Sequence, residues 1–188
     1  PRCTYGRACV LNDDCTNGRC SGLNTCSFTA ALDSISACVV NVTSADTDPN
    51  GWRFRNVIFI DSNAKLAALR DSVAGCAATG GAGGGGGWRV VGGGLWIQRA
   101  GDVVDLEALK DLRAIDGKGS LGYSLYIVNN ANLASLAGLR NVRGALPGAL
   151  YINANDRLLS LSALEGVTAI EGSLSIVGND NLVSLAGL

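Results

Sequence analysis

The chain has 188 residues, a formal net charge of −1 and no histidine. No block of Lys or Arg stands out, which argues against nucleic acid or an anionic membrane as a partner, and no apolar run approaches the roughly 18 residues of a membrane-spanning helix. The lack of histidine excludes Ser-His-Asp, Cys-His and His-metal sites, so only carboxylates remain as candidates for catalysis.

Residues 1–30 are predicted to form a disulfide-rich module. Its cysteines are Cys3, Cys9, Cys15, Cys20 and Cys26. The residues between them are mostly polar or glycine, so this segment cannot build a core and needs covalent links, which indicates an oxidising compartment. The absence of C-x-x-C pairs and of histidine argues against zinc. Because five is an odd number, the pairing stays open: one sulfur bonds to an upstream residue, a partner chain, Cys38 or Cys76.

Asn41 begins an N-V-T sequon, the acceptor for N-glycosylation. Together with the cysteines, it predicts a protein that is secreted or exposed at the cell surface.

The segment D-x-D-x-N-G from Asp46, Asp48 and Asn50 to Gly51 resembles the first half of a calcium loop. The twelfth position of that loop is Val57, where calcium needs a bidentate Glu. A plain surface turn is therefore favoured over a metal site, and no metal or other cofactor is expected.

A motif of two alternating aliphatic residues, an Asn and spaced leucines occurs five times. It begins at Ile58, Leu95, Leu125, Leu150 and Leu174. Alternation places both aliphatic side chains of each copy on one face of a short strand. A near-constant period of this length predicts stacked repeats that share one core, with their strands forming a parallel sheet along a solenoid.

Each repeat is predicted to return to its next strand along a tight helical or irregular path. Leucines at every third position, such as Leu133, Leu136 and Leu139, turn one apolar edge inward. The Asn after each strand is expected to be buried and to form a ladder between repeats. The ladder residues are Asn63, Asn130, Asn155 and Asn179. Ala100 stands at this position in the second copy, so an irregular rung is expected there. The segment Ala77–Gly87 has almost no side chains to bury and is predicted to be a flexible insertion.

The residue between the two aliphatic positions is aromatic in four successive copies. These residues are Phe59, Trp96, Tyr126 and Tyr151, followed by Ser175. Alternation places them in one column on the outer face of the sheet. Two interpretations remain open: the column binds a partner protein or a sugar chain, or another part of the protein covers it.

Four carboxylates are the candidates for acid catalysis, as in a carbohydrate-active β-helix enzyme. They are Asp61, Asp102, Asp105 and Glu107. The sequence does not bring any of them together with a second carboxylate across repeats, so solvated surface charge is the favoured interpretation.

The repeat resembles the receptor L domain of the insulin-receptor and epidermal-growth-factor-receptor families. The shared pattern is L-x-I-x-x-N-x-x-L-x-x-L-x-x-L followed by I-x-G-x-L-x-I. Its best match here is I-E-G-S-L-S-I, from Ile170 to Ile176. The resemblance spans about residues 37–188. It implies a right-handed β-helix related to leucine-rich repeats and an extracellular binding role. It also implies a disulfide between Cys38 and Cys76, because cysteines recur at these two places in that family.

We therefore expect a mainly β protein: residues 1–30 as the disulfide-rich module and residues 31–188 as a leucine-rich-repeat-like β-solenoid with short helical segments. The final residues stop within a repeat, so the chain is expected to be part of something longer. The predicted function is non-catalytic extracellular recognition or assembly, with protein neighbours, glycans or further copies of the chain as partners. The alternative is the carbohydrate-active enzyme that uses acidic residues.

Overall fold

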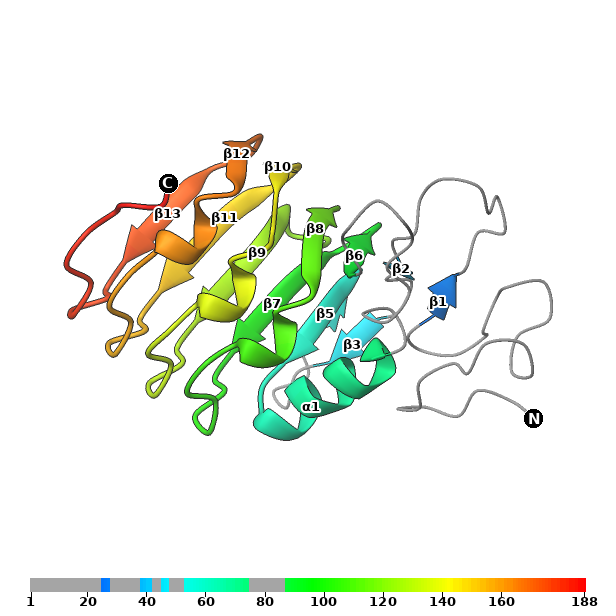
Figure 1. Ribbon diagram of the computed structural model, residues 1–188, viewed down its shortest axis with the longest axis horizontal. Helices are drawn as coiled ribbons and strands as arrows, with labels where there is room; N and C mark the ends of the chain where they lie inside the picture. The colour runs from blue at the N-terminus through cyan, green and yellow to red at the C-terminus, as the bar shows by residue number, and fades with distance from the viewer. Residues whose placement is uncertain (1–24, 28–37, 42–44, 48–52, 75–86) are drawn as a thin grey trace.

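The computed structural model describes residues 25–27, 38–41, 45–47, 53–74 and 87–188. Within these ranges the protein is mainly β, with parallel strands and little helix. Figure 1 shows the repeats side by side, in chain order, along the long axis of the molecule.

The predicted strand of every motif copy is present. These strands are β5 (Val57–Ile60), β7 (Gly94–Gln98), β9 (Tyr123–Val128), β11 (Ala149–Asn153) and β13 (Leu174–Val177). They form one parallel sheet in the order β13-β11-β9-β7-β5. Motif positions face each other in register, with Leu95 opposite Leu125 and Leu150 opposite Leu174. The parallel sheet predicted from the repeat is confirmed.

A second row of strands, which the sequence analysis did not predict, completes each repeat. It comprises β2 (Cys38–Asn41), β6 (Trp88–Val91), β8 (Leu112–Asp116), β10 (Gly144–Leu146) and β12 (Val167–Ile170). β2, β6 and β8 pair in parallel, as do β10 and β12. The short strand β1 (Thr25–Ser27) adds antiparallel to β2, and β3 (Ala45–Thr47) pairs antiparallel with β4 (Arg53–Arg55).

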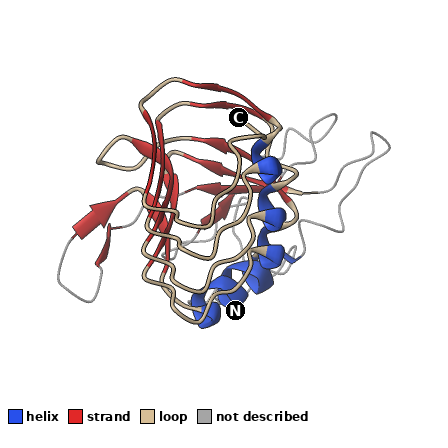
Figure 2. Ribbon diagram, turned by 90° about the vertical axis from the view of Figure 1, so that its left-hand side faces the viewer, coloured by secondary structure: helices blue, strands red, loops and turns tan. Residues whose placement is uncertain are grey.

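Helical turns follow the strands of the five-stranded sheet, as the leucine spacing predicts. They are α1 (Asn63–Ser72), η1 (Glu107–Leu109), η2 (Ala137–Leu139) and η3 (Ser162–Leu164), the last three being 3-10 turns. Seen along the stack, they lie on a side of their own, away from the strands (Figure 2). Ser62 caps α1 because its hydroxyl accepts a hydrogen bond from the Lys65 N–H. In the part of the chain that is described, no helix is long and apolar enough to cross a membrane.

The core runs through the stack as one continuous cluster. The paired aliphatics of β7, β9 and β11 are 0 % exposed, and so are the return-path residues Leu133, Leu139, Leu158 and Leu164. In the last described repeat, Leu174 is 51 % exposed because no further strand lies beside it among the described residues. Burial of the two motif aliphatics is therefore confirmed, and it weakens only at the end of the stack.

An asparagine ladder joins successive repeats at the bend after each strand. Asn130 Nδ2 donates to Ile97 O, 3.0 Å away, and Asn155 Nδ2 donates to Ile127 O, also 3.0 Å away. Asn155 Oδ1 accepts from both the backbone N–H and the side-chain amide of Asn130. Asn179 repeats this pattern beneath Asn155. The ladder is confirmed from Asn130 to Asn179.

The ladder ends on Ala100, as the substitution at that position predicts. The backbone N–H of Ala100 donates to Asn130 Oδ1, 3.0 Å away. Ala100 has no side-chain amide, so it cannot continue the ladder to the preceding repeat. The inclusion of Asn63 in the ladder is wrong. Asn63 begins α1 and is exposed, and its amide donates to the backbone oxygen of Asp102. A true helix replaces the 3-10 turn in this repeat, and its first residue turns outward.

The neighbouring residues Leu158 and Leu159 test the inward face of the return path, because Leu158 is 0 % exposed and Leu159 is 55 % exposed. We expect Leu158→Ala to lower the free energy of unfolding by about 2–5 kcal/mol, since it leaves a cavity in a packed core. Leu159→Ala should change it by less than about 0.5 kcal/mol. Denaturant melts of the two variants measure both values, and equal losses would contradict the assignment of faces.

Candidate functional site

The predicted aromatic column exists on the outer face of the five-stranded sheet. The strand register places Phe59 beside Trp96, Trp96 beside Tyr126, Tyr126 beside Tyr151, and Tyr151 beside Ser175. The inner neighbours of these residues are the core aliphatics, so the pleat directs the rings to the opposite side.

Exposure of the column is graded along the stack. Phe59 is 5 % exposed and Trp96 is 1 % exposed, whereas Tyr126 and Tyr151 are half-buried. Of the two interpretations of the column, coverage by another part of the protein therefore applies to Phe59 and Trp96. Part of the cover is the turn between β8 and β9: a Cβ at Gly119 would lie 2.4 Å from Val57 Cγ1 and 3.4 Å from Trp96 Nε1. Only a residue without a side chain allows this turn to lie so close to the column.

Tyr123 is a member of the aromatic site that the sequence analysis missed. Its ring lies 5.1 Å from Tyr126 and 5.6 Å from Tyr151, centroid to centroid. It reaches the column because the register shifts at this point: Tyr123 faces Ala149, whereas Leu125 faces Leu150. The extra residue, Ser124, is buried, and its hydroxyl bridges Gly117 O and Gly148 N. A bulge of this kind redirects a side chain. We name Tyr123, Tyr126 and Tyr151 the tyrosine face.

The rings of the column stack on one another, which limits what they can offer a ligand. Trp96 and Tyr126 have ring centroids 4.7 Å apart with planes at 29°, and Tyr126 and Tyr151 have centroids 5.2 Å apart with planes at 12°. Both faces of Tyr126 are thus covered by neighbouring rings. The stacked tyrosines present ring edges and hydroxyl groups along their length, and within the stack an uncovered tyrosine ring face can exist only at Tyr151.

The phenol of Tyr126 is electrostatically perturbed. Burial raises its pKa above the ordinary value of 10.0, the neighbouring phenols of Tyr151 and Tyr123 raise it further, and Arg99 opposes the change. The Tyr126 hydroxyl therefore stays neutral at physiological pH and acts as a hydrogen-bond donor and acceptor.

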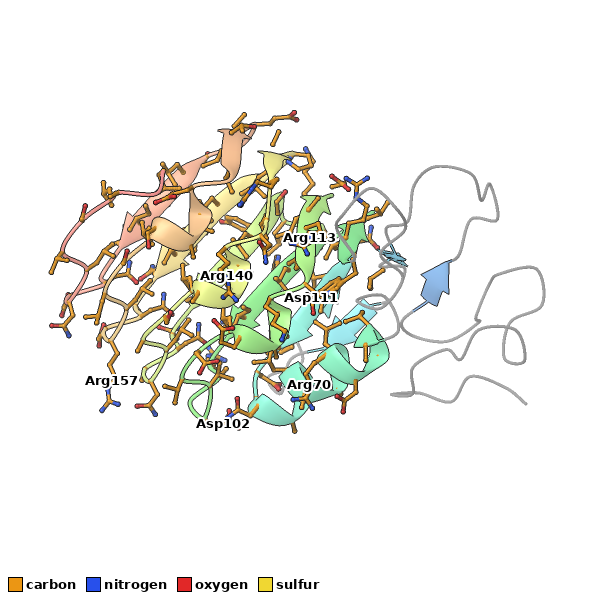
Figure 3. The ribbon with its side chains drawn as sticks, in the orientation of Figure 1. Arg70, Asp102, Asp111, Arg113, Arg140 and Arg157 are labelled. Carbon is orange, nitrogen blue, oxygen red and sulfur yellow. The ribbon has the colours of Figure 1, made fainter. Side chains whose placement is uncertain are left out.

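A second surface, on the side of the helical turns, carries most of the candidate carboxylates. An open groove of about 530 Å³ lies between α1 and η1, lined by Leu66, Ala67, Arg70, Glu107 and Lys110 among others. Figure 3 shows Arg70, Asp102 and Arg140 on this side. Arg140 bonds to Glu107 at 2.8 Å and Arg70 bonds to Asp71 at 2.8 Å. These ion pairs neutralise much of the local charge.

Each of the four candidate catalytic carboxylates has a structural contact. Asp61 pairs with Lys65 at 3.0 Å, Asp102 accepts from the N–H of Asn63, and Asp105 accepts from the N–H of Glu107. Glu107 is the partner of Arg140. Capping and pairing account for all four, and the contacts show no acid and base aimed at a common point.

Several predicted features lie outside the described residues, in whole or in part. Cys3, Cys9, Cys15, Cys20, Cys76, Asp48, Asn50 and Ala77–Gly86 are all outside them. Cys26 lies in β1, Cys38 begins β2, Asn41 ends β2 and Asp46 lies in β3. The disulfides and the glycan therefore stay predictions, and so does the preference for a surface turn over a calcium loop. Among the residues that are described, no group of His, Cys, Asp or Glu could hold a metal ion.

The raised pKa of Tyr126 predicts a pH dependence of stability. In the alkaline range the unfolded chain loses this proton before the folded chain does, so the folded state loses stability as the pH rises above about 10. We expect Tyr126→Phe to remove that part of the decline. Urea melts at several pH values give the free energy of unfolding of the unaltered protein and of the variant. If the two plots of this free energy against pH stay parallel through the alkaline range, the raised pKa of Tyr126 is contradicted.

Comparison with known protein families matches residues 88–163 to the receptor L domain. The matched segment runs from the start of β6 into η3, and it contains Trp96 and the whole tyrosine face. No curated protein matches the chain. The receptor L domain is a non-catalytic binding domain that is typically extracellular. The resemblance indicated by the sequence motifs is thus confirmed: residues 88–163 carry the pattern of a receptor L domain.

Proposed function

We propose that this protein is a non-catalytic recognition module of a larger secreted or cell-surface protein, and that the tyrosine face contacts a partner protein. The observation that carries this proposal is the half-buried stack of Tyr126 and Tyr151, with Tyr123 beside it, on a regular sheet. Aromatic side chains are enriched in protein interfaces because they supply large contact areas at small entropic cost. Here they are also held by their neighbours, so binding needs little further ordering.

A protein partner fits this face better than a glycan does. Sugar recognition by tyrosine relies on an open ring face, and the stacking of Tyr126 between Trp96 and Tyr151 leaves the column with such a face only at its Tyr151 end. The ring edges and hydroxyl groups instead suit the mixed apolar and hydrogen-bonding contacts of a protein surface. The match to a receptor L domain agrees with a protein ligand.

The proposed architecture follows the same comparison. Residues 31–188 would wind as a right-handed, leucine-rich-repeat-like β-solenoid, preceded by the disulfide-rich module of residues 1–30. The Cys38–Cys76 disulfide and a glycan on Asn41 would stabilise and solubilise the protein outside the cell. These features suit a receptor-like or assembly-forming surface protein, and the partner can include a second copy of the chain.

The double variant Tyr126→Ser, Tyr151→Ser tests the function. The full chain, immobilised, is panned against a displayed library of random peptides, and self-association is followed by sedimentation velocity. We expect the double variant to lose at least about tenfold in affinity for the selected peptides, in the range of a single interface hot spot.

The matched control removes exposed apolar side chains from other places: Val104→Ser with Leu159→Ser, at positions 54 % and 55 % exposed. The control should bind like the unaltered protein. If the tyrosine variant has an unchanged melting temperature, an unchanged affinity for the selected peptides and unchanged self-association, the tyrosine face is not the binding surface. Binding of a glycan array in place of peptides would show that the partner class is wrong.

A further inference from the structure

We propose that the ring face of Tyr151 beside Ser175 binds the guanidinium group of an arginine on the partner protein. This inference rests on the proposed function, because it names one contact within the tyrosine face. It starts from the point where the aromatic column ends. Ser175 is the next position in register after Tyr151, and it lies in β13, an edge strand of the sheet that the described residues form.

Ser175 continues the column without a ring, because a serine side chain is far smaller than the tyrosine ring beside it. Tyr126 covers one face of Tyr151, and Tyr123 leans against it at 57° from β9, on the same side of β11 as Tyr126. Among the described residues, no ring is placed against the face of Tyr151 that looks toward Ser175. A planar group could lie there at the 5.2 Å centroid spacing that separates Tyr126 from Tyr151.

At the opposite end of the same column, the terminal ring, Phe59, is in contact with a cation. Phe59 lies in the other edge strand, β5, and the ammonium of Lys65 sits 4.8 Å from the centroid of its ring. Aromatic faces carry partial negative charge and attract cations. Within the described ranges, the chain supplies its own cation at Phe59, and no cation is placed over the ring of Tyr151.

Asn153 supplies a hydrogen-bond acceptor that favours a cationic donor over an uncharged ring. Its Nδ2 donates to the hydroxyl of Tyr151, 2.8 Å away. Its Oδ1 points toward the following repeat, because a Cβ at Gly178 would lie 3.5 Å from it. A guanidinium stacked on Tyr151 could donate an N–H to this oxygen. Arginine combines a planar cation with several donors, whereas an aromatic side chain offers a flat face and at most one donor.

The test titrates N-acetylarginine amide into the full chain and follows the ring protons of Tyr151 and Tyr126 by NMR. N-acetyltyrosine amide and methyl glucoside are the competing probes. We expect the arginine probe to change the chemical shifts of the Tyr151 ring protons more than the other two probes do, with a response that saturates as its concentration rises. Ser175→Leu, which fills the space with a side chain that has no aromatic face, should weaken this binding about two- to fivefold. Ser175→Ala is the matched control and should leave it unchanged.

A second variant keeps the test decisive if Ser175→Leu disturbs the fold. Asn153→Asp replaces the acceptor amide by a carboxylate, and it should strengthen binding of the arginine probe without strengthening that of the tyrosine probe. Stronger binding of the tyrosine or glucoside probe at Tyr151 would overturn the inference. So would an unchanged arginine affinity in both Ser175→Leu and Asn153→Asp.

The two proposals can fail separately. The arginine probe can leave the Tyr151 signals unchanged while the double variant Tyr126→Ser, Tyr151→Ser still abolishes peptide capture. In that case the proposed guanidinium contact is wrong, and the tyrosine face is still supported as the recognition surface. If the double variant also captures peptides normally, both proposals fail.

Discussion

The structure depends on satisfying the backbone at the bend that follows each strand of the five-stranded sheet. At this bend the chain leaves the sheet, and its carbonyl and amide groups lie in the interior, where water cannot reach them. Asn130 and Asn155 are 0 % exposed, and each supplies both donors and an acceptor there. Unpaired polar groups in such a place would cost about 1–3 kcal/mol each. One asparagine side chain per repeat satisfies these groups at the rungs of Asn130, Asn155 and Asn179.

The ladder also fixes the relative position of neighbouring repeats. Each amide bonds to the preceding strand end and to the next asparagine, as Asn155 does with Ile127 O and Asn179 Oδ1. The residue before each rung takes a left-handed backbone, at Arg99, Asn129, Ala154 and Gly178. This common bend holds the strands in one register. Because the register is constant, the outer positions align too, and the aromatic side chains meet in a column.

That alignment connects the fold to the proposed function. The inner positions of each strand hold the core, so the outer positions are free to differ from repeat to repeat. In the first repeats the outer rings are packed under a turn that includes Gly119, and in the later repeats they become accessible. A single column of residues therefore stabilises one end of the stack and offers a surface at the other.

The sequence predicted the features that repeat, and it missed those set by contacts between distant segments. The alternation of Leu125 and Ile127 and the spacing of Leu133, Leu136 and Leu139 are local patterns, and both lead to buried residues. The second row of strands was missed because its strands are short and pair with strands of other repeats, as Leu112 does with Trp88.

The errors at the site have similar causes. Burial of Trp96 depends on the turn near Gly119, more than twenty residues further along the chain, and its cover cannot be seen in the motif. Tyr123 joins the face through a one-residue bulge that breaks the alternation on which the prediction relied. Asn63 occupies the motif position of a rung, but the longer helix α1 turns it outward.

The central claim is that the buried amides hold the repeats together, and Asn155→Ala tests it most directly. Removing this side chain leaves Ile127 O and the backbone N–H of Asn130 without their partner. We predict that the free energy of unfolding in denaturant falls by about 2–6 kcal/mol, the cost of two buried unsatisfied groups. Asn181→Ala, which removes an exposed amide bonded to Asp156 O, should cost less than about 1 kcal/mol. Equal and small losses in the two variants would contradict the account.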